Sequence, residues 1–422
     1  MKTNRTLAME GKGVGTMRTR CRYLLALLFV GLALTCASPG LAKVYFQCPG
    51  YNPAVDSDGN GDGMLRAADG EISAPLYPTQ VCVHLVGGDG FATMADAADT
   101  SMYIFGFHNV TGVPDDQVMN MFDAGGGVLA ANWPAPTLVF SEGDYVYLTL
   151  TNVGMMMRPD LFDPHTVHWH GFPNASAVFD GVPDNSISIN MGSSLTYFYH
   201  VVEPGTFLYH CHVEATEHMQ MGMLGNLYVS PALGANYAYN DLATAFDREF
   251  PIQIHAFDPR FHKQHIAVQP LPFARMRDTF PMLNGRGYPD TVNSANIPNE
   301  LGYDAQTLPT KIEAAPGDTI LLRFSSLSTT SFHTLATTGI PMKVIGNGSR
   351  IYRGAGEVAG QDISYMTTSV TLGGGEAMDV LLDTTGIPEG TYFLYSTNLN
   401  HLSNDTEDYG GMMTEIRVQT GL

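Results

Sequence analysis

From about residue 81 to the C-terminus, short runs of apolar and polar residues alternate and end at glycine, proline or aspartate. Two examples are Pro134-Ala135-Pro136-Thr137-Leu138-Val139-Phe140 and Gly143-Asp144-Tyr145-Val146-Tyr147-Leu148-Thr149-Leu150. A period of two is typical of strands with one buried face, and the turn residues separate successive strands. The 45 glycines and 25 prolines favour turns and short strands over long helices. The pattern predicts an all-β protein.

The strand pattern occurs twice along the chain. Pro316-Gly317-Asp318-Thr319-Ile320-Leu321-Leu322-Arg323 repeats the run at Gly143, and Gly390-Thr391-Tyr392-Phe393-Leu394-Tyr395 repeats Gly205 to Tyr209 with one inserted residue. A repeat of about 170 residues indicates a duplicated domain rather than a solenoid. We therefore predict domains at residues 81–235 and 236–422, after an N-terminal extension at residues 43–80.

The first 42 residues have the pattern of a secretory signal. Arg18, Arg20 and Arg22 precede an apolar run, Tyr23 to Leu34, that is too short to span a membrane, and Gly40-Leu41-Ala42 is a plausible cleavage site. Met17 is an alternative initiator, and lipidation at Cys36 is a weaker alternative to cleavage. We expect an exported protein of the periplasm or cell surface.

Charge limits the possible partners. The formal net charge is −20, and removal of the Arg-rich first 42 residues makes it more negative. Such a surface repels nucleic acid and anionic lipid and attracts cations. No stretch after the signal is long and apolar enough to cross a membrane. We expect neither a nucleic-acid partner nor a membrane span.

Three cysteines remain after removal of the signal. In an oxidising compartment Cys48 and Cys82 are the natural disulfide pair, which leaves Cys211 as a free thiol. A free thiol in an exported protein requires an explanation, and ligation of a metal provides one.

A possible calcium loop lies in the extension, in Asp56-Ser57-Asp58-Gly59-Asn60-Gly61-Asp62-Gly63. Oxygen ligands alternate at Asp56, Asp58, Asn60 and Asp62, as a calcium loop requires. The twelfth position is Ala67 rather than Glu, which excludes an EF-hand. A plain Asp/Gly turn is an equal alternative.

Two histidine-rich segments carry the candidate chemistry. In Tyr209-His210-Cys211-His212-Val213, alternation on a strand points His210 and His212 to one side and Cys211 to the other. In His165-Thr166-Val167-His168-Trp169-His170-Gly171, alternation likewise separates His168 and His170 from His165. Thiolate, imidazole and a weak thioether form the ligand set of a blue-copper centre. The two segments therefore predict two adjoining metal sites.

These motifs, His-x-x-His-x-His-Gly with His-Cys-His-x(5)-His-x(4)-Met, resemble the multicopper oxidase family of cupredoxin proteins. The resemblance implies two cupredoxin-like Greek-key β-sandwich domains. It also implies that His165, Cys211, His218 and Met223 hold a type 1 copper. His168, His170, His210 and His212 would then supply one domain's share of a type 2/type 3 copper cluster. The run from Asn152 to Pro164 resembles bacterial surface multicopper proteins linked to manganese or iron turnover.

The second copy of the pattern has lost these residues. Ala336 and Thr338 lie over His168 and His170, and we expect Ser396-Thr397-Asn398 over His210-Cys211-His212. His333, His401 and Met412 or Met413 alone echo the ligands. The second domain is therefore predicted to be degenerate, without copper ligands, and His255, His262, His265 and His401 are interpreted as structural or surface residues.

Two carboxylates match positions of catalytic acids in the family. Asp180, in Asp-Gly-Val, corresponds to the residue that assists protons at the cluster, and Glu214 to an acid near the metal ligands. A turn aspartate and a solvated glutamate are equal alternatives. The methionines are open to two interpretations as well, Cu(I) binding or packing; they are Met155, Met156, Met157, Met219 and Met221.

The resemblance implies a copper oxidoreductase that takes electrons from a metal ion or small reductant and passes them to oxygen. Because the family's oxygen-reducing cluster needs eight histidines and one chain supplies four, we predict that another subunit completes it in a homo-oligomer. The alternative is an electron-transfer or copper-binding surface protein that does not reduce oxygen.

Overall fold

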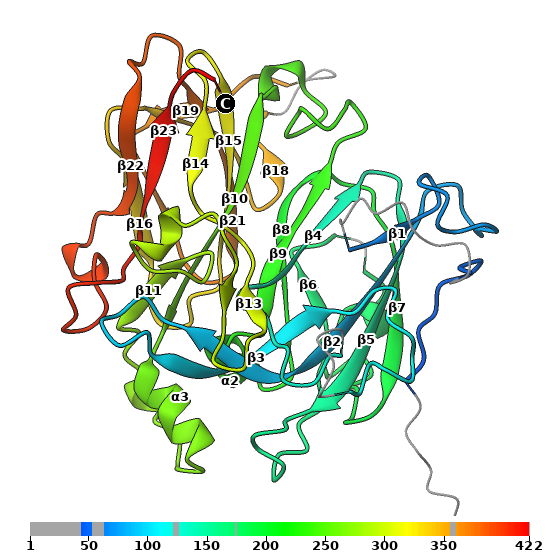
Figure 1. Cartoon of the computed structure of the whole chain (residues 1–422). Helices are drawn as coiled ribbons and strands as arrows, with labels where there is room; N and C mark the ends of the chain where they lie inside the picture. Colours follow the sequence, from blue (N-terminus) through cyan, green and yellow to red (C-terminus); the bar gives the residue numbers. More distant parts are fainter. Residues whose placement is uncertain (1–43, 53–62, 121–125, 174, 355–359, 422) are drawn as a thin grey trace, which may run out of the picture. The chain divides into compact units, whose positions relative to one another are not determined.

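A computed structural model describes residues 44–52, 63–120, 126–173, 175–354 and 360–421 (Figure 1). The predicted signal segment lies outside the described residues, and so do the four proposed calcium ligands Asp56, Asp58, Asn60 and Asp62. The described chain consists mainly of strands joined by turns, with a few short helices. The all-β prediction is confirmed.

The first group of strands forms two sheets, β1-β2-β5-β7 with β3 beside β2, and β4-β9-β8-β6. Buried side chains of both sheets meet in one core, for example Leu85 of β2 and Phe207 of β8. This packing makes a β-sandwich. Its strands are β1 Leu65–Arg66, β2 Gln80–Thr93, β3 Ser101–Asn109, β4 Ala135–Ser141, β5 Tyr145–Gly154, β6 His168–His170, β7 Ser194–His200, β8 Gly205–His210 and β9 Leu224–Ser230.

The second group repeats this arrangement in the sheets β11-β10-β15-β21-β17-β18, with β19 beside β17, and β14-β23-β22-β16-β20 (Figure 1). A separate core lies between these sheets, with Leu322 of β15 and Leu394 of β22. The strands are β10 Arg248–Phe257, β11 Phe280–Leu283, β12 Ile297–Pro298, β13 Asp304–Gln306, β14 Ile312–Ala314, β15 Thr319–Ser326, β16 His333–Thr337, β17 Met342–Asn347, β18 Arg350–Ile351, β19 Tyr365–Thr367, β20 Ser369–Leu372, β21 Glu376–Asp383, β22 Gly390–Ser396 and β23 Met413–Val418.

The helices connect strands rather than form a layer. Two of them, α2 and α3, bear on the candidate site, because α2 carries His218 and α3 carries His265. The helices are α2 Ala215–Met221 and α3 Pro259–Ile266, with 3₁₀ turns η1 Ala177–Phe179, η2 Leu242–Thr244, η3 Phe273–Arg275, η4 Asp290–Val292 and η5 Leu399–His401. None of the helices that the structure describes is long and apolar enough to cross a membrane.

The strand pairing confirms the predicted duplication. In the first sandwich β2 pairs with β5 and β4 with β9 in parallel, and in the second β10 pairs with β15 and β14 with β23 in parallel. The remaining principal pairs, such as β8 with β9 and β22 with β23, are antiparallel. Two sandwiches with the same mixed pairing are the cupredoxin-like architecture that the resemblance implies.

The expected alignment of the second copy is wrong at one point. Gly205 pairs with Val229, and Gly390 pairs with Val418 in the same way, so no residue is inserted between the two strands. Tyr395-Ser396-Thr397, rather than Ser396-Thr397-Asn398, therefore lies over His210-Cys211-His212. The sequence alignment matched Tyr395 to Tyr209, whereas the backbone pairing fixes which residue faces which side.

A disulfide joins the N-terminal segment to the first sandwich. Cys48 and Cys82 are bonded, as predicted, and Cys82 lies on β2. Strand β1 pairs with β2 beside this bond, with Leu65 opposite Cys82. Among the described residues Cys211 is the free cysteine, and it is buried.

Polar side chains hold the two sandwiches together. Thr206 of β8 donates a hydrogen bond of 2.5 Å to Asp379 of β21, and Tyr239 donates another of 2.5 Å to the same carboxylate. Arg323 of β15, which is fully buried, lies 3.7 Å from Asp379 and 2.7 Å from Glu249. A buried guanidinium needs such partners. β8, which leads to Cys211, is thereby fixed against the second sandwich.

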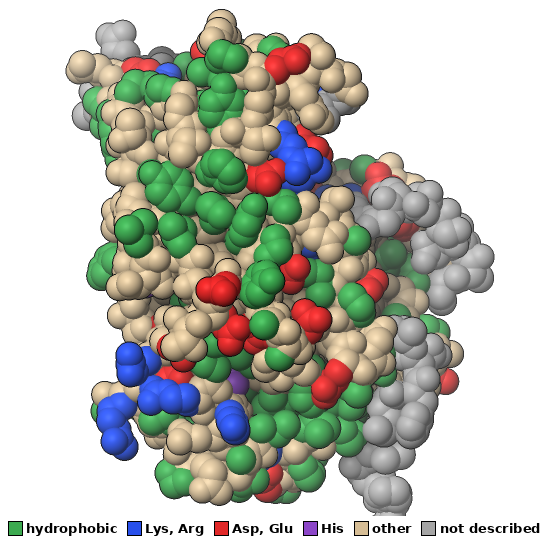
Figure 2. Space-filling model, turned by 60° about the vertical axis from the view of Figure 1, so that its left-hand side comes forward, with side chains coloured by type: hydrophobic (Ala, Val, Ile, Leu, Met, Phe, Trp, Pro, Cys, Tyr) green, Lys and Arg blue, Asp and Glu red, His purple; other side chains and the backbone are tan. Residues whose placement is uncertain are grey.

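Acidic side chains are spread over the face shown in Figure 2, whereas basic side chains gather in a few places. This distribution agrees with the formal net charge of −20. It favours cationic rather than anionic partners.

Candidate metal centre

Cys211 lies one residue beyond the end of β8 and is fully buried. Its N–H donates a 3.0 Å hydrogen bond to the carbonyl oxygen of Met223, so the pairing with the start of β9 continues by one residue. This pairing sets Cys211 and Met223 opposite each other although they are twelve positions apart.

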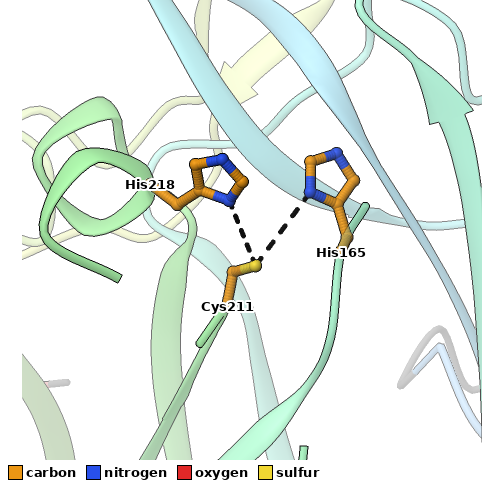
Figure 3. A group of neighbouring side chains, drawn as sticks. All are labelled: His165, Cys211 and His218. Carbon is orange, nitrogen blue, oxygen red and sulfur yellow. Dashed lines mark hydrogen bonds between the residues drawn. The ribbon is translucent and has the colours of Figure 1, made fainter. Parts of the chain in front are cut away.

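Two imidazoles point at the Cys211 sulfur from different segments (Figure 3). The Sγ atom lies 3.2 Å from Nδ1 of His218 and 4.0 Å from Nδ1 of His165. The three candidate ligand atoms lie within 4.8 Å of one another, and all three residues are buried. One thiol and two imidazole nitrogens that converge in this way can hold a single metal ion.

The short helix α2 brings His218 and Met223 back to the cysteine. It begins after Glu214, which has a positive φ of 44°, and ends at Gly222, with φ 116°. A Cβ atom at Gly222 would lie 2.8 Å from the carbonyl oxygen of Phe105, so the position favours glycine. Met223 then donates its N–H to the carbonyl oxygen of His218 at 2.9 Å.

Met223 lies next to His165 against strand β2. A Cβ atom built on Gly87 would lie 3.0 Å from Cδ2 of His165 and 3.3 Å from Cε of Met223. The absence of a side chain at Gly87 therefore gives both residues room. The thioether of Met223 is fully buried and belongs to the same core as Cys211. All four residues that the resemblance assigns to type 1 copper are thus in one place.

Burial sets the protonation of this group. It raises the pKa of the Cys211 thiol to about 11 and lowers the pKa of His165 to about 3, and it lowers the pKa of His218 as well. Both imidazoles are therefore neutral at pH 7, and each has a lone pair available for a metal. A cation that binds here displaces the thiol proton.

A separate histidine group lies on the opposite side of the same backbone and consists of His168, His170, His210 and His212. Strands β6 and β8 pair with His168 opposite His210 and His170 opposite Leu208. Neighbouring ring centroids in the group are 5.2–5.7 Å apart. Nδ1 of His170 lies 3.2 Å from Nε2 of His210. The predicted alternation around Cys211 is therefore what the structure has.

Backbone carbonyls orient two of these rings. Nδ1 of His210 donates to the carbonyl oxygen of Cys211 at 2.8 Å, and Nδ1 of His168 donates to that of Asp180 at 2.6 Å. With the proton on Nδ1, the lone pair is on Nε2. Asp180 thus lies beside the histidine group, with its carboxylate 3.5 Å from His168.

The histidine group lines a cavity of about 340 Å³. The second sandwich forms the far wall through Leu327, Ser328, Thr329, Gly374 and Gly375. A Cβ atom at Gly375 would lie 2.9 Å from the ring of His170, so this wall is close. Among the residues described as lining the cavity, all four imidazoles come from the first sandwich.

Glu214 is not placed at the histidine group. It lies with Asp163 beside His218, and the candidate ligand atoms of the three residues are within 4.8 Å of one another. Nε2 of His218 has no hydrogen-bond partner and lies 3.9 Å from Asp163. Burial raises the pKa of both carboxyls. The sequence reasoning missed Asp163, although it stands two residues before His165.

Three other histidines occupy the places expected of structural residues. His262 donates to the carbonyl oxygen of Tyr103 at 2.6 Å, and His265 lies 2.8 Å from Glu217 of α2. His255 packs edge-on against Trp133.

Two family models described as multicopper oxidase match residues 125–233 and 262–418, together more than half of the chain. L-ascorbate oxidase of Cucurbita pepo var. melopepo is 26% identical over 274 residues, which cover 62% of this chain and 45% of that enzyme. Laccase-1 of Emericella nidulans is 34% identical over 99 residues, 23% of this chain and 15% of that enzyme. The chain spans less than half the length of these curated relatives.

Among solved structures, a blue copper oxidase from Nitrosomonas europaea is similar, with a TM-score of 0.60 and 22% identity. The match covers 80% of this chain and 86% of that one. A copper nitrite reductase from Nitrosomonas europaea has a TM-score of 0.54 at 17% identity and covers 81% of this chain. These similarities support the two-sandwich fold.

Proposed function

Because this chain belongs to the multicopper oxidase family, we propose that it is a copper-dependent oxidoreductase. It takes electrons from a metal ion or small reductant beside His218 and delivers them to oxygen at the histidine group. One observation supports this most strongly. Cys211 reaches one group of candidate ligands while its covalent neighbours His210 and His212 reach the other. The backbone therefore connects the two groups.

The residues fit copper. A buried thiol has the Nδ1 atoms of two neutral imidazoles beside it and a buried thioether nearby, which is the ligand set of a type 1 site. We assign His165, Cys211, His218 and Met223 to that site. A copper ion supplies one-electron redox chemistry there. Helix α2 brings His218 and Met223 to the cysteine, and the space at Gly87 leaves room for His165 and Met223.

A cationic reductant suits the surroundings of His218. Asp163 and the exposed Glu214 place two carboxyl groups beside this imidazole. Carboxylates attract metal ions such as Mn²⁺ or Fe²⁺ and hold them by oxygen ligands. We therefore favour a metal ion over a neutral organic molecule as the reductant. In this proposal Glu214 acts on the reductant side and Asp180 on the oxygen side.

At the oxygen side, the four histidines would hold copper of type 2 or type 3. Asp180 orients His168 through its backbone carbonyl, and its carboxylate is near enough to relay protons. The wall of the cavity formed by Leu327 to Thr329 and Gly374 to Gly375 has no imidazole. We propose that the first domain of a second copy completes the set in a homo-oligomer.

The alternative is an electron-transfer or copper-binding surface protein without oxygen reduction. The lack of imidazoles on the second-sandwich wall of the cavity favours it, because four histidines are half of the ligand set that the family uses to reduce oxygen. Copper content and oxygen uptake separate the two functions. Two or more copper ions per chain with uptake support the oxidase, and one copper ion without uptake supports the alternative.

We further propose that residues 1–42 are a signal peptide and that the mature protein is exported to the periplasm or cell surface. The Cys48–Cys82 disulfide supports this, because such bonds persist in oxidising compartments. We also propose domain limits of 81–235 and 236–422, which the division of the strands into β2–β9, from Gln80, and β10–β23 supports. Mass spectrometry of the mature N-terminus tests the cleavage after Ala42.

A further inference from the structure

The second sandwich contains a counterpart of the Cys211 pocket. Ser396 donates its N–H to the carbonyl oxygen of Met412 at 2.9 Å, as Cys211 donates to Met223 at 3.0 Å. Ser396 and Met412 are both fully buried. In position and burial, Ser396 therefore replaces the cysteine and Met412 replaces the methionine.

Both histidines of the pocket have counterparts as well. Met412 donates its N–H to the carbonyl oxygen of His401 at 2.7 Å, which repeats the contact of Met223 with His218. His333 stands three residues before Ala336, which pairs with Tyr395. In the same way His165 stands three residues before His168, which pairs with His210. The second sandwich lacks the thiol but has kept the other three residues.

The two imidazoles are arranged as metal ligands. Nδ1 of His333 lies 3.2 Å from Nδ1 of His401. Two nitrogens bound at 2.0–2.1 Å to one tetrahedral ion are about 3.3 Å apart. The ring centroids are 4.9 Å apart at 51°, against 5.2 Å and 66° for His165 and His218. The spacing therefore needs almost no change to accept an ion.

In the metal-free protein Nδ1 of one ring donates a hydrogen bond to Nδ1 of the other, and an ion would take the place of that proton, which moves to Nε2. Burial lowers the pKa of His333 to about 4 and also lowers that of His401, so both rings are neutral at pH 7. Nε2 of His333 is buried without a hydrogen-bond partner. Nε2 of His401 lies 3.2 Å from the exposed Asn398, whose amide can rotate to present oxygen or nitrogen.

From this arrangement we propose that His333, His401 and Met412 bind a single Cu(I) ion in the second sandwich. Two imidazoles and a thioether are neutral, and the thioether is a soft ligand that favours Cu(I). The hydroxyl of Ser396 stays protonated at neutral pH, so it does not replace a thiolate. A buried neutral ligand set accepts one positive charge at a smaller desolvation cost than two. The site therefore favours Cu(I) over divalent metals and has no blue colour.

An ion can enter at His401, which is half-buried. Phe332, next to His333 in the sequence, and Leu399, two residues before His401, have exposed side chains. The inference does not rest on the proposed oxidase activity, because the count of Cu(I) bound at His333 and His401 requires neither oxygen nor copper in the Cys211 pocket.

Anaerobic Cu(I) titration against the chelator bathocuproine disulfonate tests the site in the full chain. The double variant His333→Ala/His401→Ala should bind one Cu(I) fewer than wild type and keep the blue colour of the Cys211 site. The matched control, His200→Ala on the exposed end of β7, should bind as much as wild type. Equal Cu(I) stoichiometry in the double variant and wild type would overturn the proposal.

Two further variants keep the test decisive if the double variant fails to fold by circular dichroism. His401→Ala alone, at a half-buried position, should weaken the affinity of one Cu(I) by tenfold or more. Ser396→Cys restores the missing thiol and should add a second blue centre with Cu(II), so that the blue absorbance roughly doubles. A folded Ser396→Cys protein with one extra free thiol and unchanged blue absorbance contradicts the proposed pocket.

Discussion

Nδ1 of His168 donates a 2.6 Å hydrogen bond to the backbone carbonyl oxygen of Asp180, and the carboxylate of Asp180 lies 3.5 Å from the same nitrogen. The backbone therefore fixes the tautomer of His168, and the side chain of Asp180 is free for another task. We therefore expect that a mutation can separate metal binding from proton transfer at this position.

Asp180→Asn should leave copper content unchanged, because the carbonyl that orients His168 remains. Oxygen uptake should fall about tenfold or more, since the side chain can no longer carry a proton. The defect should shrink as pH falls and protons become available from solvent. Oxygen-electrode rates and copper analysis check this, with the exposed Asp184→Asn as control. A parallel loss of copper would assign Asp180 a structural role instead.

Cys211→Ser should abolish the blue colour. At pH 7 the wild-type thiol is protonated, because burial raises its pKa to about 11, so loading with Cu(II) releases one proton from it. The variant should release one proton fewer per chain, which calorimetry in two buffers of different ionisation enthalpy measures. If Cys211 is a copper ligand, the variant loses both the blue colour and the released proton. A blue Cys211→Ser protein rules out the assignment.

The sequence determines much of this site because alternation along a strand is a local property. His210 ends β8 and Cys211 and His212 follow it directly, so their directions follow from continued alternation along the strand. The disulfide follows from cysteine number, the duplicated all-β chain from repeated strand and turn patterns, and the two-sandwich fold from the resemblance to a known family. These features need no knowledge of what packs against them.

Contacts between distant segments could not be predicted in this way. Asp163 reaches His218 only because a loop and helix α2 meet, and Gly87 matters only because His165 and Met223 lie against β2. The register of β22 was also misjudged, because a match of tyrosines outweighed the pairing with β23. Backbone hydrogen bonds then placed Ser396, not Thr397, over Cys211.

Asp163→Asn and Glu214→Gln, together, should raise the KM for Fe²⁺ or Mn²⁺ about tenfold with little change in kcat, since they remove charge that attracts the cation. A neutral phenolic reductant should be unaffected. The exposed Asp383→Asn in the second sandwich is the control. Because burial raises the pKa of both carboxyls, they lose charge as pH falls, and the wild-type KM for the cation should rise at mildly acidic pH. Equal effects on both reductants would contradict a cation-binding role.

Acid should destabilise the metal-free protein through buried neutral histidines. His84 stacks on Phe46 and bonds to Thr151, and burial lowers its pKa to about 4 from an ordinary 6.5. The unfolded chain therefore binds more protons below pH 6.5, and stability falls as pH drops from 6.5 through 4. At pH 5 proton uptake by His84 in the unfolded chain lowers the free energy of unfolding by about 2 kcal/mol.

Urea unfolding at pH 7 and pH 5 measures this effect. In His84→Gln the loss of stability between the two pH values should be smaller than in wild type by about 2 kcal/mol. His200→Gln, at an exposed position, should lose as much as wild type. An unchanged pH dependence in His84→Gln would mean that the unfolded chain does not take up a proton at this residue.

Assembly should depend on copper at the histidine group. His168, His170, His210 and His212 line a cavity whose other wall has no imidazole, and a second copy can supply four more. An ion held by both copies stabilises their association, because it binds the oligomer more tightly than the monomer.

Sedimentation velocity with and without copper tests this linkage. Wild type should sediment as a larger species when loaded, and His168→Ala/His170→Ala should lose that shift while it keeps the blue colour. His200→Ala serves again as the matched histidine control and should behave as wild type. A fully loaded wild type that stays monomeric leaves the four histidines with half a ligand set. That result would favour the electron-transfer function, because the connection from Cys211 would then end at copper that is not arranged to reduce oxygen.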